Sequence, residues 1–129
     1  MTPRLGKVLH IDLTEKKSSV EERPELFSKY LGGAGVASKL LEEQCPPRVD
    51  PFSPEAPVIL AIGPFTSLLP SMVKTVAMFK SPLTGNLGES HCGGHLATAI
   101  RFSGFGALVV KGVAAVSYTH LTLPTNREV

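Results

Sequence analysis

The N-terminal part of the chain alternates between apolar and polar positions. Between Lys7 and Leu13, Leu9 and Ile11 alternate with polar His10 and Asp12, which predicts a strand with one buried face. The polar residues 14–17 predict a turn, and residues 18–22 predict the return strand of a hairpin.

The apolar period then lengthens to that of helices. Pro24 suits the first position of a helix, and Glu25 suits the positive end of its dipole. The apolar face of this helix is predicted to consist of Leu26, Phe27, Tyr30 and Leu31. Gly32 and Gly33 end it. A second short helix follows, with Val36, Leu40 and Leu41 directed inward.

The remaining pattern predicts buried strands separated by irregular segments. Five prolines between Cys45 and Pro57 predict a surface connection. Buried strands are expected over 58–62, 75–79 and 107–110, and a short helix over 95–102. The chain is therefore predicted to have an α+β fold, rich in strand, with two short helices near 24–44 and one near 95–102.

The segment from Lys80 to Gly94 combines a Pro/Gly turn, the hydroxyls of Thr84 and Ser90, His91, Cys92 and a double glycine. Glycine has no Cβ, so a bound group can approach the backbone closely. The segment predicts a loop that binds a polar ligand by hydrogen bonds. Nearby basic residues favour an anionic ligand, although solvated positions suit them equally; they are Lys74, Lys80 and Arg101.

Other chemical interpretations lack their context. The glycines between Gly32 and Gly35 follow a predicted helix rather than a strand, and Ser38 stands where a dinucleotide motif needs its third glycine. We interpret these glycines as a break between two helices. The backbone amides that begin the second helix could still bind phosphate oxygens. His91 and Cys92 have no second ligand pair nearby, so no metal site is predicted. No base is evident that would activate Cys92 as a nucleophile.

Length and composition limit the function classes. A chain of 129 residues with 43% hydrophobic and 19% charged residues predicts one soluble globular domain. A net charge of +2 and scattered lysines argue against nucleic acid as a partner, and the lack of a long apolar run argues against a membrane. Two widely spaced cysteines predict free thiols and a cytoplasmic location.

The C-terminal segment from Val116 to Val129 is expected to be non-native. Its first part, Val116 to Thr125, is the translation of GTCTCTTATACACATCTGACGCTGCCGACG, a string that resembles a transposon-type sequencing adapter. The alternative is a genuine terminal strand. On the first interpretation, residues 1–115 are the partial N-terminal domain of a longer protein.

An ordered series of motifs resembles one known family. The series is Tyr30–Gly35, Cys45–Pro47, Asp50–Glu55, Gly63–Thr66, Lys80–Gly85, Gly93–Gly94 and Phe102–Phe105. In this order and spacing it resembles the N-terminal domain of the aldehyde:ferredoxin oxidoreductase family, from about Gly6 to Ala115.

The resemblance implies a set of cofactors and partners. These are a tungsten or molybdenum ion held by two pterin dithiolenes, a [4Fe-4S] cluster ligated by later domains, a small aldehyde substrate that is oxidised to a carboxylate, and a ferredoxin-like electron carrier. A homo-oligomer is compatible with it. In such enzymes the cofactor carries the redox step and the protein supplies position and electrostatics.

The resemblance also assigns cofactor-binding positions. Lys74 replaces an arginine that contacts the cofactor, His91 replaces an asparagine, and Gly93 matches a glycine. Lysine keeps the charge but loses the bidentate fork of arginine. These departures suggest a divergent subfamily. No catalytic or metal-ligating residue is expected in this segment, which alone should be inactive and poorly soluble. The alternative is a non-catalytic module that binds a small ligand or a protein.

Overall fold

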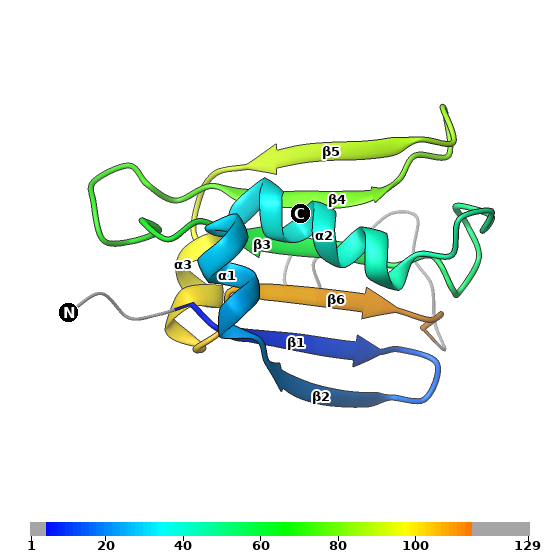
Figure 1. Ribbon diagram of the computed structural model, residues 1–129, viewed down its shortest axis with the longest axis horizontal. Coiled ribbons are helices and arrows are strands. Elements are labelled where there is room, and N and C mark those ends of the chain that lie inside the picture. Colours follow the sequence, from blue (N-terminus) through cyan, green and yellow to red (C-terminus); the bar gives the residue numbers. More distant parts are fainter. Residues whose placement is uncertain (1–4, 115–129) are drawn as a thin grey trace, which may run out of the picture.

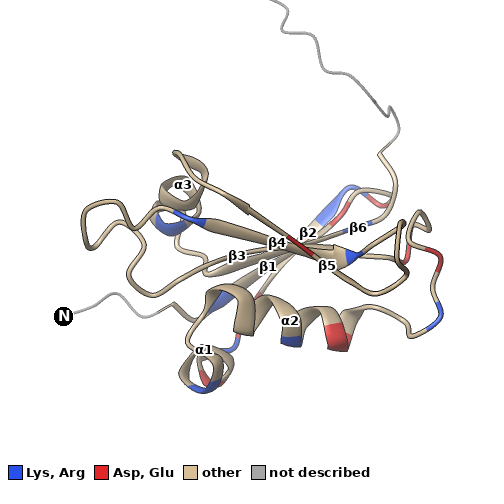
Figure 2. Ribbon diagram, turned by 90° about the horizontal axis from the view of Figure 1, so that it is seen from above, with Lys and Arg blue, Asp and Glu red and all other residues tan. Residues whose placement is uncertain are grey.

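The computed structural model describes residues 5–114, in which a single mixed sheet separates two layers of helix (Figures 1 and 2). The strands are β1 (Lys7–Asp12), β2 (Lys17–Glu22), β3 (Val58–Ile62), β4 (Thr75–Lys80), β5 (Leu87–Cys92) and β6 (Ala107–Lys111). The helices are α1 (Pro24–Tyr30), α2 (Gly33–Gln44) and α3 (Leu96–Phe102). The expected non-native tail over 116–129 lies outside the described residues. The predicted α+β fold is confirmed.

The sheet has the order β2-β1-β6-β3-β4-β5, so β2 and β5 form its edges. Only the β1–β6 pair is parallel; the other neighbouring strands in the described part of the chain are antiparallel. The last strand thus enters the sheet beside the first one (Figure 1). Helices α1 and α2 cover one face, and α3 lies on the other (Figure 2).

Most of the core lies between the sheet and α2. Val36, Ala37 and Leu40 of α2 are fully buried against the sheet. The sheet contributes its inward side chains to the same cluster: Val8, Ile59, Ala61, Val76, Met78, Ala107 and Val109. A smaller cluster of Ile62, Ala97 and Ile100 lies under α3. On β1 the fully buried side chain is Val8, whereas Leu9 and Ile11 are half-buried on the other face.

The junction between α1 and α2 departs from the predicted apolar face. Leu31 has a φ of 69°, which ends α1 at Tyr30 and leaves the Leu31 side chain 69% exposed rather than packed. Gly32 follows with a φ of 129°, a conformation that favours glycine. A Cβ built on Gly32 would lie 2.8 Å from the carbonyl oxygen of Ile62. The start of α2 is therefore held against the end of β3.

The segment from Lys80 to Gly94 is not one binding loop. It contains β5, which pairs with β4 in a hairpin, and only its two ends are irregular. In the turn at the first end, the hydroxyl of Ser81 accepts from the amides of Leu83 and Thr84. The length of β5 separates this turn from Gly93 (Figure 1). The Pro/Gly turn and the double glycine therefore lie at opposite ends of the hairpin.

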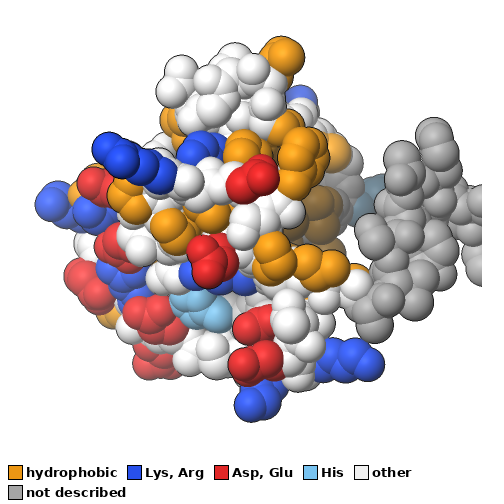
Figure 3. All heavy atoms as spheres, turned by 90° about the vertical axis from the view of Figure 1, so that its right-hand side faces the viewer, with side chains coloured by type: hydrophobic (Ala, Val, Ile, Leu, Met, Phe, Trp, Pro, Cys, Tyr) orange, Lys and Arg blue, Asp and Glu red, His pale blue; other side chains and the backbone are white. Residues whose placement is uncertain are grey.

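The end of the molecule that carries the β1–β2 turn bears charges of both signs. Figure 3 shows acidic and basic side chains interspersed with apolar ones on that side. At the β1–β2 turn itself, the carboxylate of Asp12 accepts from the amides of Thr14 and Glu15. Within residues 5–114, no helix has the length and hydropathy needed to cross a bilayer.

Arg23 connects β2, α1 and α2 through the carboxylates of Glu21, Glu25 and Glu43. Its guanidinium donates to both carboxylate oxygens of Glu43, at 2.5 and 3.1 Å, and its Nε lies 3.5 Å from a carboxylate oxygen of Glu21. The hydrogen bond from Arg23 lowers the pKa of Glu43, and the hydrogen bond to Glu43 raises the pKa of Arg23. The pair ties the C-terminal turn of α2 to the end of the β1–β2 hairpin.

We expect Gly32→Ala to lower the free energy of unfolding by about 1–3 kcal/mol, because the added Cβ meets a backbone carbonyl at a positive φ. Gly63→Ala is the control, since a Cβ there meets no atom within 4 Å and the φ of Gly63 is not positive. Urea unfolding followed by circular dichroism measures both. Equal stability of the two variants would contradict the close approach of α2 to β3.

We expect Glu43→Gln to lower the free energy of unfolding by about 1 kcal/mol at neutral pH. The lowered pKa of Glu43 means that the pair stabilises the fold above the ordinary carboxyl value of 4.5, and that this stability is lost as the pH falls through the lowered value. The difference between the wild type and Glu43→Gln should therefore shrink in acid. Urea unfolding at neutral pH and near pH 3 measures it.

Glu42→Gln provides the matched control for this titration. The side chain of Glu42 is 71% exposed and pairs only with Lys39 among the charged groups of the described chain. Exposed pairs at this helical spacing contribute about 0.3–0.5 kcal/mol. A pH dependence as large in Glu42→Gln as in Glu43→Gln would show that Arg23 does not hold Glu43.

Candidate functional site

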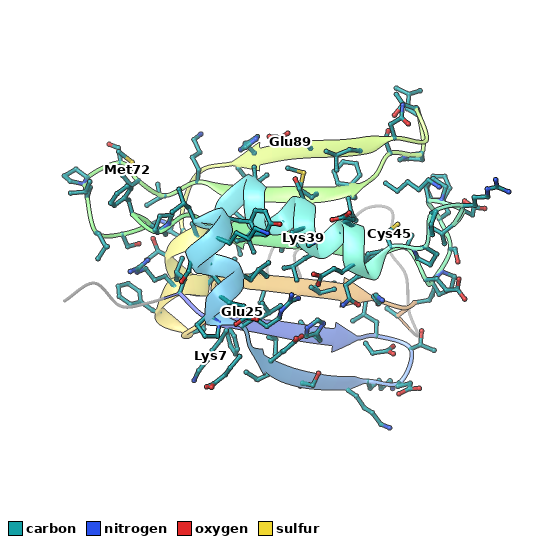
Figure 4. All side chains as sticks on the ribbon, viewed as in Figure 1. Lys7, Glu25, Lys39, Cys45, Met72 and Glu89 are labelled. Atoms are coloured by element: carbon teal, nitrogen blue, oxygen red, sulfur yellow. The ribbon has the colours of Figure 1, made fainter. Side chains whose placement is uncertain are left out.

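A pocket of about 290 Å³ lies at the end of the sheet where α2 begins, and we call it the α2 pocket. It is formed by the start of α2, the loop between β3 and β4, and the facing ends of β4 and β5. Figure 4 labels Met72 on this loop. The pocket is lined by Gly33, Ala34, Ala61, Gly63, Pro64, Phe65, Thr66, Ser71, Met72, Lys74, Val76 and His91.

The N-terminus of α2 supplies backbone donors to the pocket. Gly33 and Ala34, the first residues of this twelve-residue helix, line it, and the N-cap residue Gly32 offers no side chain to accept from their amides. The first amides of a helix have no partner within the helix, and they carry the positive end of its dipole. This wall of the pocket therefore favours a negatively charged or hydrogen-bond-accepting group.

The three residues assigned from the resemblance come together here. Lys74 precedes β4, and His91 lies on β5 opposite Val76, so both side chains line the pocket. A Cβ built on Gly93 would lie 3.4 Å from Nζ of Lys74. Glycine at position 93 thus leaves room for the ammonium group of Lys74. These positions are brought together although residues 75–90 separate them in sequence.

Glu89 contacts His91 at the rim of the pocket. The Nε2 atom of His91 forms a hydrogen bond with the carboxylate of Glu89, two residues earlier on the same strand. The side chains of His91 and Glu89 are 52% and 45% exposed. The imidazole is therefore oriented by a carboxylate while it remains open to a ligand.

The other basic residues considered with the binding loop lie elsewhere. Lys80 is at the far end of β4, where its ammonium donates to the carbonyl of Val49 at 2.6 Å. Arg101 is buried on α3, and its guanidinium donates to the carbonyl of Pro64 at 3.1 Å. Both side chains bind loop carbonyls away from the α2 pocket. The prediction that Lys80 and Arg101 join Lys74 around one ligand is therefore wrong.

The hydroxyl groups considered as ligand contacts do not reach the α2 pocket either. The hydroxyl of Thr84 accepts from the amide of Asn86 within the turn between β4 and β5. Ser90 pairs with Ala77, and strand alternation places its side chain on the face opposite to that of His91. Thr66 and Ser71, from the loop between β3 and β4, line the pocket instead.

The sequence reasoning missed the apolar wall of the pocket and the partner of His91. Phe65 and Met72 line the pocket from the loop between β3 and β4, and the sequence pattern predicts no ligand contact for either residue. Glu89 shares a face with His91 because residues two apart in a strand point the same way, a signal that becomes visible only when residues 87–92 are recognised as a strand.

The described residues hold no evident metal centre. Within residues 5–114, no group of three or more histidine, cysteine, aspartate or glutamate side chains is placed to hold a metal ion. Cys45 is half-buried at the end of α2, and Cys92 is exposed on β5. The α2 pocket itself offers positive charge, amide donors, an imidazole and an apolar wall.

Comparison with known proteins identifies the domain. Residues 8–122 match the family model described as aldehyde ferredoxin oxidoreductase, N-terminal domain. The chain is 38% identical over 111 residues to a tungsten-containing aldehyde ferredoxin oxidoreductase of Pyrococcus furiosus. This match covers 84% of the present chain and 18% of the Pyrococcus protein. The chain is 30% identical over 113 residues to the aliphatic sulfonate oxidoreductase, WOR-like subunit, of the same organism, with the same coverage of both.

A solved structure shows the same fold. The active-site complex BamBC of benzoyl coenzyme A reductase, solved with 1,5-dienoyl-CoA, aligns with a TM-score of 0.80 and 31% sequence identity. The alignment covers 85% of this chain and 17% of that one. The chain thus spans about a fifth of the length of these relatives. We conclude that the chain belongs to the aldehyde ferredoxin oxidoreductase family and corresponds to the N-terminal domain of that family.

Proposed function

We propose that this domain forms one wall of the pterin-binding site of a tungsten or molybdenum oxidoreductase. The observation that carries the proposal is the convergence of Lys74, His91 and the N-terminus of α2 on one apolar pocket. The family resemblance connects Lys74, His91 and Gly93 with the cofactor, and the structure adds the N-terminus of α2 to the same pocket. Each residue supplies a property that an anionic pterin needs.

The polar groups of the α2 pocket suit an anion attached to a heterocycle. The ammonium of Lys74 and the amides of Gly33 and Ala34 would hold phosphate or other acceptor atoms. His91 would form a hydrogen bond to the ring. Phe65 and Met72 would pack against its flat, apolar faces and exclude water.

The size of the pocket supports a shared site. Pockets for small ligands commonly measure about 300–1,000 Å³, and the α2 pocket, at about 290 Å³, lies at the lower limit. A pair of pterins with their phosphates needs more space than this. We infer that the domain contacts one part of the cofactor and that other parts of the full-length protein supply the remaining walls.

The bound cofactor would supply two-electron redox chemistry at the metal, while this domain would supply binding and electrostatics. Lys74 would neutralise negative charge beside the ring system. The α2 amides are held by the contact of Gly32 with β3 and need no rearrangement to receive an anion. This domain itself would therefore not be catalytic.

For the full-length protein we propose oxidation of an aldehyde to its carboxylate. A ferredoxin-like protein would accept the electrons through a [4Fe-4S] cluster, and the cysteine ligands of this cluster would lie outside this domain. The enzyme would be cytoplasmic, and it could form a homo-oligomer. The support is the similarity to aldehyde ferredoxin oxidoreductases at 35–38% identity. Relatives named for an aliphatic sulfonate and for benzoyl coenzyme A act within the same scaffold, so substrate choice would depend on the other walls.

We expect Lys74→Ala to reduce the pterin and metal content of the purified full-length protein severalfold, because a charged hydrogen-bond donor to the cofactor is lost. Lys74→Arg should retain the content, because arginine keeps the charge and forms two hydrogen bonds to one anion. Pterin fluorescence after oxidation and elemental analysis for tungsten and molybdenum measure the two contents.

Lys17→Ala is the matched control for this experiment. It removes the same charge from a side chain that is 77% exposed at the start of β2, at the end of the sheet opposite to the α2 pocket. If Lys17→Ala and Lys74→Ala lost cofactor equally, the effect would be one of overall charge, and the assignment of Lys74 to the site would be overturned.

The parent gene offers a test of the whole-protein proposal. Because the remaining walls and the cluster ligands must come from elsewhere, we expect the gene to continue past Ala115 for several hundred codons and to encode cysteines in a CxxC-type cluster motif. Sequencing the genomic locus across Ala115 measures this. A stop codon shortly after Ala115 would favour a small-ligand or protein-binding module on the same scaffold.

A further inference from the structure

Glu89 and His91 face the side of the sheet that carries the α2 pocket. They lie on β5, which forms an edge of the sheet (Figure 4), and their register partners are Met78 and Val76 of β4. Both partners belong to the core cluster under α2. Side chains at paired positions share a face, so the carboxylate and the imidazole project toward the helix-covered side.

The contact between these two residues fixes the role of each ring nitrogen. The Nε2 atom of His91 meets the carboxylate of Glu89. An ionised carboxylate only accepts hydrogen bonds, so Nε2 carries the proton and donates it. In the neutral imidazole Nδ1 is then an acceptor, and none of the residues described contributes a hydrogen bond to Nδ1.

An acceptor at this position complements the rest of the pocket. Lys74 and the first amides of α2 are donors only, and the hydroxyls of Thr66 and Ser71 can serve as either. A heterocycle that carries an anionic group would use the donors, while an N–H group on its ring edge needs an acceptor. His91 Nδ1 provides that acceptor on the β5 side of the pocket.

The identity of residue 91 explains why a partner is needed. The family resemblance places an asparagine at this position, and an amide can present its oxygen without help from a neighbour. A neutral histidine presents an acceptor at Nδ1 in only one of its two tautomers. A neighbour that accepts from Nε2–H therefore raises the share of the tautomer with an acceptor at Nδ1 and fixes the orientation of the ring, and Glu89 is placed to do so.

We propose that Glu89 is a positioning residue that holds His91 in the Nε2–H tautomer, so that Nδ1 accepts a hydrogen bond from an N–H group of the heterocycle in the α2 pocket. The proposal rests on the function proposed above, since it assigns an orientation to the ligand of the same pocket. It adds a specific role for Glu89, a residue that does not itself line the pocket.

A merely structural role for the pair makes a different prediction. Both side chains are about half exposed at a sheet edge, and exposed ion pairs contribute roughly 0–1 kcal/mol to stability. We therefore expect Glu89→Ala to leave the free energy of unfolding nearly unchanged. A large loss of stability would assign Glu89 to the fold rather than to the orientation of His91.

The tautomer can be measured directly on the full-length protein, labelled with ¹⁵N at histidine, by two-bond ¹H–¹⁵N NMR at about pH 8. We expect almost only the Nε2–H tautomer for His91 in the wild type and in Glu89→Gln, whose amide oxygen still accepts, and a measurably smaller share of it in Glu89→Ala. The His10–Glu21 pair is an internal control, because it has the same contact at 2.8 Å outside the α2 pocket. An unchanged His91 tautomer in Glu89→Ala would overturn the proposal.

The second measurement is the rate at which the full-length holoenzyme loses pterin. We expect Glu89→Ala to accelerate the loss about three- to tenfold, the effect of one hydrogen bond, and Glu89→Gln to preserve the rate. In a His91→Asn background the sensitivity to Glu89 should disappear, because asparagine accepts without a partner. An equal effect of Glu89→Ala in both backgrounds would overturn the proposal.

The two measurements separate this inference from the proposed function. Absence of pterin from the wild type and from every variant would overturn both. A normal rate of pterin loss in Glu89→Ala, together with a wild type that contains pterin, would overturn the role of Glu89 and leave the proposed function standing.

Discussion

The close contact between Gly32 and the carbonyl of Ile62 is the constraint on which the rest of the site depends. It fixes the start of α2 against the end of β3, while Val36, Ala37 and Leu40 bury the remainder of the helix on the sheet. Burial of such side chains contributes about 1.5–3 kcal/mol for each large one, so the helix cannot shift along the sheet without a substantial cost. Its first amides therefore stay at the mouth of the α2 pocket.

Much of the fold could be predicted from the sequence because local signals and burial agree. Pro24, the glycines after Tyr30 and the apolar run at Val58 mark elements that the structure contains. The exception is β5, for which the sequence pattern predicts a loop. Its residues, Leu87 to Cys92, carry no strand pattern of their own, since the strand is an exposed edge stabilised by its ladder with β4. Residues 87–92 form a strand because they pair with β4, and this pairing between distant residues leaves no pattern in the sequence of β5 itself.

The same omission limited the prediction of the site. Lys74, His91 and Gly93 came from family resemblance, and the hairpin of β4 and β5 explains why positions so far apart in sequence lie together. Lys80 and Arg101 are close to these residues in sequence but not in space, because Lys80 lies at the far end of β4 and Arg101 lies on α3. Proximity in sequence is therefore a weak guide to which residues share a site. Glu89 was overlooked because strand alternation is the only signal that connects it with His91.

The energies available in the α2 pocket indicate how this domain divides its work with the rest of the protein. A helix N-terminus contributes about 0.3–1 kcal/mol, one charged hydrogen bond about 1.5–3 kcal/mol, and one neutral hydrogen bond about 0.5–1.5 kcal/mol. Association costs about 4 kcal/mol or more. These groups alone would therefore bind a pterin weakly. Under the proposed function their value would lie in selecting the orientation of the pterin, with its anion at α2 and an N–H edge at His91, while most of the affinity would come from walls outside this domain.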